Sequence, residues 1–234
     1  MTTASPEHHH DHRDVTGGWL RPAVFGAMDG LVSNTALIAG VAGGGASPST
    51  VALAGLAGLV AGALSMATGE YTSVASQAEL ARAEIEIEKR EIARVPAAEE
   101  AELAGIYLSR GVDEATAREV ARQLSADPEQ VWRVHAREEL GIDPDDLPSP
   151  WVAAGSSLGA FSLGALVPVL PYLLGATSLA LAVGLALLAL FATGALVSRF
   201  TSRGALYSGM RQLVLGAAAA AATYGIGSVV GTAL

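Results

Sequence analysis

Five long apolar segments dominate this sequence and constrain its fold more than any other feature. They cover residues 18–43, 48–73, 150–174, 177–200 and 204–230. A helix needs about 20 mainly apolar residues to cross the hydrocarbon core of a membrane. Each segment reaches that length, and only 16% of the 234 residues in the chain are charged. We therefore expect an all-α integral membrane protein with five transmembrane helices.

The basic residues indicate how these helices are oriented. The 14 Lys and Arg residues lie before or at the start of the first segment, between the second and third, and around the turn between the fourth and fifth. Cytoplasmic loops carry the excess of Lys and Arg in membrane proteins. The pattern predicts a cytosolic N-terminus and a non-cytosolic C-terminus. The chain is rich in Ala and Arg, which GC-rich prokaryotic genomes favour. We therefore expect the protein to lie in a bacterial plasma membrane.

The second apolar segment continues beyond the membrane. No proline occurs between Pro48 and Pro96, so one helix of about 70 Å is expected, against about 30 Å of hydrocarbon. Its second half should project as a stalk into the cytosol. Shorter helices are expected at residues 97–110, 113–126 and 128–140. Residues 78–146 thus form a cytosolic helical insert between membrane segments 18–77 and 147–234.

The N-terminal residues 1–17 are polar and contain four histidines. We expect a disordered cytosolic tail, in which the histidines either have no role or bind metal loosely. The chain has no cysteine, which excludes disulfides and thiolate metal sites. Its net charge of −9 argues against nucleic-acid binding, which needs a basic surface.

Acidic residues recur on single faces of the stalk and insert helices. They are Glu84, Glu88 and Glu91 on the stalk, Glu99 and Glu102 on the next helix, and Glu139 with His135 on the last. Like charges at such spacing repel one another, unless a cation lies between them. Inward-facing carboxylates on neighbouring helices build metal sites in helical bundles. The spacing predicts either a metal-binding insert or ordinary solvated acidic faces.

Two acids, Asp29 and Glu70, lie within the apolar segments. An ionisable group inside a membrane is costly and is a candidate functional residue. Met28 neighbours Asp29, Ser33 follows it by one helical turn, and Met66 precedes Glu70 by one turn. Carboxylate, thioether and hydroxyl groups together suit a divalent transition metal better than Ca²⁺ or Mg²⁺. The alternatives are a buried protonated Asp29 and methionines that only fill space.

Three glycine pairs with GxxxG spacing occur in the apolar segments. They are Gly26 and Gly30, Gly58 and Gly62, and Gly155 and Gly159. Small residues at this spacing let membrane helices approach closely and often mediate dimerisation. These pairs predict tight helix contacts, within one chain or between two.

Several stretches resemble the vacuolar iron transporter family. They are MDGLVSN at residues 28–34, LVAGALSMATGEYTSVASQ at 59–77 and VPAAEEAEL at 95–103. The order of elements is also similar, with two spans, a helical insert and three spans. The resemblance implies a homodimer, not an enzyme and without a permanent cofactor. It would export Fe²⁺ and related divalent metals from the cytosol in exchange for protons.

The same resemblance implies roles for particular residues. Asp29 and Met66 would line a metal pathway at the dimer interface, formed by the first two spans. Metal ligands in the insert would be Glu88, Glu91, Glu99, Glu102 and Glu139.

Three positions depart from the plant vacuolar branch of the family. His135 and Ala136 stand where that branch has a methionine pair, and an imidazole in place of sulfur also suits Mn²⁺, Co²⁺ or Zn²⁺. Gly58 stands where that branch has a glutamate. Glu70 resembles the arrangement in the nodulin-like branch and is expected near the cytosolic mouth of the pathway.

The membrane acids suggest how metal and proton transport would be coupled. An empty carboxylate in the membrane favours its protonated form, and a divalent cation displaces that proton when it binds. A group that holds either a proton or a metal is the minimal element of an antiporter. The alternative function is a membrane-anchored metal sensor or buffer without transport, which leaves Asp29 and Glu70 unexplained.

Overall fold

The computed structural model describes residues 18–200 and 202–233, and these residues are helical with short connections. The elements are α1 (Leu20–Gly43), α2 (Pro48–Arg94), α3 (Pro96–Ser109), α4 (Glu114–Leu124), α5 (Pro128–Glu138), α6 (Pro150–Leu173), α7 (Leu179–Val197), the 3-10 helix η1 (Ser198–Phe200) and α8 (Ala205–Ala233). Within these ranges no strand occurs, and α1, α2, α6, α7 and α8 are long and apolar enough to cross a membrane. The all-α class is confirmed, and the five predicted spans correspond to five candidate membrane-spanning helices. The histidine-containing tail lies outside the described residues.

Local sequence explains where the helices begin and end. The Ser47 hydroxyl accepts a hydrogen bond from the backbone N–H of Thr50 at the start of α2. Asp127 accepts one from the N–H of Glu129 at 2.9 Å and so caps α5. Side-chain caps of this kind satisfy N–H groups that the first helical turn leaves free. After α3, Gly111 has a φ of +92°, a conformation that glycine adopts without steric cost.

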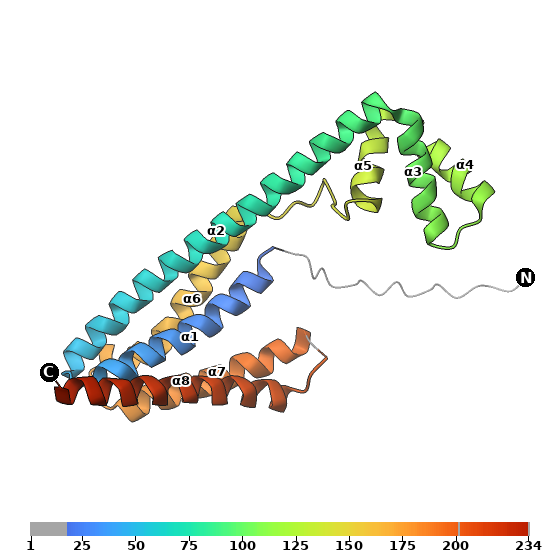
Figure 1. The fold of residues 1–234 in the computed structure, drawn as a ribbon. Helices are drawn as coiled ribbons and strands as arrows, with labels where there is room; N and C mark the ends of the chain where they lie inside the picture. Colours follow the sequence, from blue (N-terminus) through green and yellow to red (C-terminus); the bar gives the residue numbers. More distant parts are fainter. Residues whose placement is uncertain (1–17, 201, 234) are drawn as a thin grey trace, which may run out of the picture.

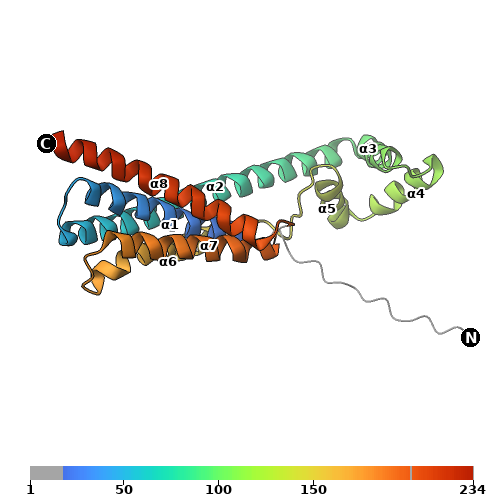
Figure 2. The ribbon, with the colours of Figure 1, turned by 90° about the horizontal axis from the view of Figure 1, so that it is seen from below.

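Helix α1 lies at the centre of the membrane bundle and packs against α2, α6, α7 and α8 (Figure 2). Its most extensive contact is with α6. A Cβ at Gly26 would lie 2.7 Å from the carbonyl oxygen of Ser157, and a Cβ at Gly30 would overlap that of Phe161. This glycine pair therefore serves packing within one chain. Gly155 of α6 has no neighbour of this kind within 4 Å.

Helix α2 runs from the membrane bundle into the insert (Figure 1). Its 47 residues span about 70 Å at 1.5 Å per residue, as the sequence predicts. Helices α3, α4 and α5 gather at its far end, where α5 turns back to pack against α2. Leu103, Ala104 and Ala121 form the small buried core of this insert.

The two ends of the bundle differ as the basic residues predict. The start of α1 and the α7–α8 connection lie at the end from which the stalk projects (Figures 1 and 2). The α1–α2 and α6–α7 connections and the C-terminus lie at the opposite end. Assigning the stalk side to the cytosol stays a prediction from the distribution of Lys and Arg.

Candidate metal sites

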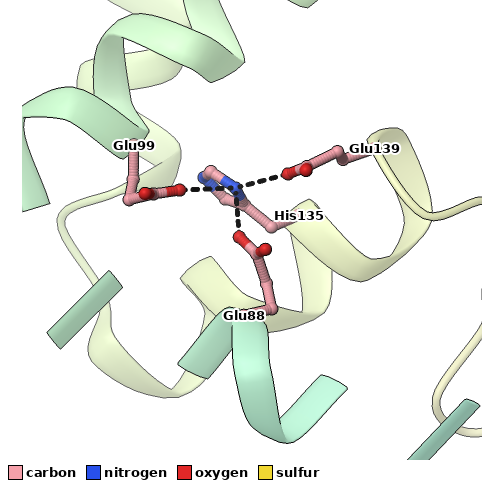
Figure 3. A group of neighbouring side chains, drawn as sticks. All are labelled: Glu88, Glu99, His135 and Glu139. Atoms are coloured by element: carbon pink, nitrogen blue, oxygen red, sulfur yellow. Dashed lines mark ion pairs between the residues drawn. The ribbon is translucent and has the colours of Figure 1, made fainter. Parts of the chain in front are cut away.

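Four side chains converge between the stalk and the insert (Figure 3). Glu88 comes from α2, Glu99 from α3, His135 from α5, and Glu139 follows the end of α5. Each offers a ligand atom, and these atoms lie within 4.8 Å of one another. His135 is 0% exposed and Glu88 is 3% exposed. We call this group the insert cluster.

The geometry of the insert cluster fits a cation better than a hydrogen-bonded network. Nδ1 of His135 lies 2.8 Å from Oε1 of Glu88, 3.6 Å from Oε2 of Glu139 and 3.9 Å from Oε2 of Glu99. Neither ring nitrogen, nor Oε1 of Glu88, makes a hydrogen bond. Two ligands at right angles about 2.1 Å from an octahedral metal lie about 3 Å apart. These closely spaced atoms therefore have the spacing of ligands around one ion.

The electrostatic environment of the insert cluster also favours a bound cation. Burial raises the pKa of Glu88 to about 7, and repulsion from Glu139 and Glu99 adds to the rise. Burial and the charge of Glu102 also raise the pKa of Glu99, against an opposing effect of His135. A site that holds two carboxylates away from water, with the exposed Glu139 beside them, favours either protons or a bound cation.

The other predicted ligands of the insert lie outside the insert cluster. Glu91 and Glu102 are exposed and act on the cluster through charge repulsion. Glu84 is half-buried, one turn before Glu88 on α2. The structure thus brings together four of the seven predicted side chains.

A contact that the sequence analysis missed holds the end of α5 against α3. Arg110 forms an ion pair with the Glu138 carboxylate and also donates to the Glu138 carbonyl oxygen at 3.2 Å. The Tyr107 hydroxyl donates to the same carboxylate at 3.2 Å. Glu138 precedes Glu139 directly, so this contact positions the ligand beside it. Because 28 residues separate Arg110 from Glu138, no local pattern reveals the pair.

A second candidate site is an open pocket of about 260 Å³ in the membrane bundle. We call it the membrane pocket. Its lining residues are Asp29, Ser33, Asn34 and Leu37 of α1, Gly58, Gly62, Ser65 and Met66 of α2, and Phe161 of α6. Three predicted pathway residues, Asp29, Ser33 and Met66, meet here. Met28 and Glu70 are half-buried and are not among the lining residues.

The environment of Asp29 is consistent with access by a cation. Asp29 is half-buried in an open pocket, unlike an acid enclosed in a helix core. The Ser33 hydroxyl donates to the main-chain oxygen of Asp29 at 2.6 Å, which leaves the Ser33 oxygen lone pairs available. Met66 packs beside Ala63 and Phe161 at the edge of the pocket. The pocket therefore offers a carboxylate, a hydroxyl and a thioether to one space.

The two candidate sites are far apart. Glu88 follows Met66 by 22 residues on the continuous helix α2, which corresponds to about 33 Å at 1.5 Å per residue. One ion cannot contact both sites at once.

Comparison with known proteins places the chain in a family. The VIT family matches residues 20–228. The chain is 41% identical to a vacuolar iron transporter of Acanthamoeba castellanii over 91% of this chain and 78% of that protein. It is 34% identical to vacuolar iron transporter 1 of Oryza sativa subsp. japonica, over 96% and 91% of the two chains.

A further relative, vacuolar iron transporter 1 of Arabidopsis thaliana, is 33% identical over 96% of this chain and 91% of its own. These relatives are named as transporters, in agreement with the expectation that the chain is not an enzyme. With five candidate spans and a family match over nearly its whole length, the chain belongs to the VIT family of membrane metal transporters.

Proposed function

We propose that this protein exports Fe²⁺ and related divalent metals such as Mn²⁺ from the cytosol in exchange for protons. The observation that carries the proposal is the membrane pocket, in which Asp29 and Met66 from two different helices face one space. The family gives the substrate class, because the relatives are named iron transporters.

Asp29 supplies the coupling in this proposal. A metal ion binds the deprotonated carboxylate, and a proton replaces the ion after it leaves. A more acidic far side then returns the pocket to its protonated form and prevents the metal from rebinding. Glu70, one turn from Met66 toward the stalk on α2, accompanies the ion at the cytosolic mouth.

The insert cluster acts first in the proposed route. Its carboxylates and imidazole suit divalent transition metals, with Mn²⁺, Co²⁺ and Zn²⁺ as further candidates beside iron. The ion then travels about 33 Å toward the pocket, given the rise of α2. The cluster either delivers metal to the pathway or regulates it.

A second copy of the chain completes the pathway in this proposal. The membrane pocket is lined by α1, α2 and α6 and is partly open. Exposed apolar residues on α2, including Leu53, Val60 and Leu64, offer a surface for either lipid or a partner. A homodimer would place two Asp29 and two Met66 residues along one route.

The membrane that holds the protein does not change the direction of transport. The relatives carry vacuolar names, whereas the composition of this chain favours a bacterial plasma membrane. Movement into a vacuole or out of a bacterial cell removes metal from the cytosol in both cases.

Flux into proteoliposomes tests the proposal. Purified protein is reconstituted with an acidic lumen, and Fe²⁺ or Mn²⁺ is added outside. We expect uptake that needs the pH gradient and stops when an ionophore abolishes it. Binding of metal without flux would instead favour an anchored sensor or buffer, and flux that is independent of pH would indicate a channel.

A further inference from the structure

The membrane pocket contains a buried oxygen atom that has no partner. Asn34 is 2% exposed and lines the pocket. Its Nδ2 donates to the main-chain oxygen of Ala165 on α6 at 2.6 Å and to that of Gly55 on α2 at 3.1 Å. Its Oδ1 makes no hydrogen bond.

These contacts fix the orientation of the Asn34 amide. Both neighbours are carbonyl oxygens, which accept hydrogen bonds and cannot donate them. The NH₂ group must therefore face Ala165 and Gly55, and rotating the amide by 180° would set three oxygens against one another. Oδ1 is consequently directed away from both helices' carbonyl groups.

Oδ1 packs closely against Gly58 and beside Leu37. A Cβ at Gly58 would lie 2.8 Å from Oδ1 of Asn34 and would overlap the side chain of Leu37. Gly58, Leu37 and Asn34 all line the membrane pocket together with Asp29. Oδ1 therefore lies in the wall of the pocket, covered by Gly58 and the exposed Leu37 side chain, and an ion reaches it when Leu37 moves aside.

We propose that Oδ1 of Asn34 is a metal ligand in the membrane pocket, and that it favours Mn²⁺ and Fe²⁺ over softer ions. Asn34 lies five residues after Asp29 on α1, which is about 7.5 Å further along the helix. It therefore forms a second, neutral contact deeper in the pocket. This inference rests on the proposed transport function and assigns one more residue to the same pathway.

The chemistry of an amide oxygen suits this role. It replaces a water molecule of the hydrated ion, as Asn carbonyl groups do in cation sites. It carries no charge and does not titrate, so it holds the ion without adding another proton-binding group beside Asp29. It is a hard ligand, whereas the Met66 thioether is soft and by itself favours softer metals. Together the two ligands set the preference among divalent ions.

A matched pair of substitutions separates the oxygen from the structural role of Asn34. Asn34→Asp and Asn34→Leu both remove the NH₂ donors, but only Asn34→Asp keeps an oxygen in the pocket. In proteoliposomes we expect Asn34→Leu to raise the KM for Mn²⁺ about tenfold more than the KM for Cd²⁺, because Cd²⁺ is the softer ion. Asn34→Asp should retain the wild-type preference for Mn²⁺. Equal Mn²⁺-to-Cd²⁺ ratios in wild type and both variants would overturn the proposal.

Gly58→Ala provides a test that keeps the Asn34 side chain, although the added Cβ would crowd both Oδ1 and Leu37. The added methyl group covers Oδ1, so we expect the KM ratio to shift toward Cd²⁺ as in Asn34→Leu. Gly184→Ala on α7 is the control, because a Cβ there meets nothing within 4 Å. If both Asn34 variants lose transport of both ions, Gly58→Ala becomes the deciding test. An unchanged ratio of the KM for Mn²⁺ to the KM for Cd²⁺ in Gly58→Ala would then overturn the proposal.

The outcomes distinguish this inference from the proposed function. Absence of metal flux in the wild-type protein would contradict transport itself. Wild-type flux with a metal preference that none of these variants alters would contradict only the role of Asn34.

Discussion

Nδ1 of His135 lies 2.8 Å from Oε1 of Glu88, yet the two atoms share no hydrogen bond. Figure 3 draws this contact as an ion pair, and a buried polar atom that makes no hydrogen bond costs about 1–3 kcal/mol. Glu99 and Glu139 add negative charge to the same space. A bound divalent cation would satisfy all four side chains, so we expect this group to bind a metal ion.

Removing one ligand of the insert cluster should weaken metal binding. We expect Glu88→Gln to lower the affinity for Mn²⁺ by at least about tenfold, because even outer-shell changes around metals commonly cost that much. Titration calorimetry on the full chain in detergent measures this. An Asp29→Asn background removes the contribution of the membrane pocket.

Glu84→Gln is the matched control for Glu88→Gln. It makes the same chemical change one turn away on α2, outside the insert cluster. Its affinity should stay close to that of the parent protein. An equal loss in both variants would show that general negative charge, not the four-ligand geometry, attracts the metal.

The imidazole of His135 should influence which metal the insert cluster prefers. His135→Asn replaces a nitrogen ligand by an amide of smaller size. Imidazole suits Zn²⁺ and Fe²⁺, whereas oxygen ligands suit Mn²⁺. We therefore expect the affinity for Zn²⁺ to fall more than that for Mn²⁺, in competition titrations with a fluorescent chelator. An unchanged affinity for both ions would mean that His135 is not a ligand, and an equal fall for both would mean that it does not set the preference.

Metal binding to the insert cluster should depend on pH near neutrality. The pKa of Glu88 is raised from 4.5 to about 7, so the metal must displace a proton below that value. Apparent affinity should fall by up to about tenfold for each pH unit below 7 and level off above it. Titrations between pH 5.5 and 8 measure this slope. An affinity that stays constant down to about pH 5 would indicate an ordinary carboxylate.

The same shift affects the stability of the metal-free protein. Glu88 binds its proton more tightly in the folded than in the unfolded state. Its contribution to stability is therefore complete below pH 4.5 and is lost as the pH rises through about 7. Bound metal should remove this loss, because it replaces the proton.

The close contact between α1 and α6 should tolerate no added side chain. Gly30→Ala would force its Cβ into the carbonyl oxygen of Phe161, and overpacking of this kind typically costs about 1–3 kcal/mol. We expect a lower midpoint of thermal unfolding in detergent. Gly155→Ala, whose Cβ meets nothing within 4 Å, should leave the midpoint unchanged. Equal destabilisation by both changes would contradict this explanation.

The sequence predicted the helices well because their determinants are local. Apolar length set the five spans, and caps such as Ser47 and Asp127 set the helix starts. The sites were predictable only in part. Helical spacing could not show that Glu88 turns inward while Glu91 stays exposed, since that depends on how α3 and α5 pack against α2. Nor could it reveal the unpaired oxygen of Asn34, which depends on carbonyl groups of two other helices.

Proton release from proteoliposomes during metal uptake tests the central claim most directly. A pH-sensitive dye reports the pH of the acidic lumen while Mn²⁺ or Fe²⁺ is added outside. In wild type we predict that metal entry and lumenal alkalinisation occur together. Asp29→Asn should abolish both. If Asp29→Asn moved metal and protons at the wild-type rate, Asp29 would not be the coupling residue and the account would be wrong.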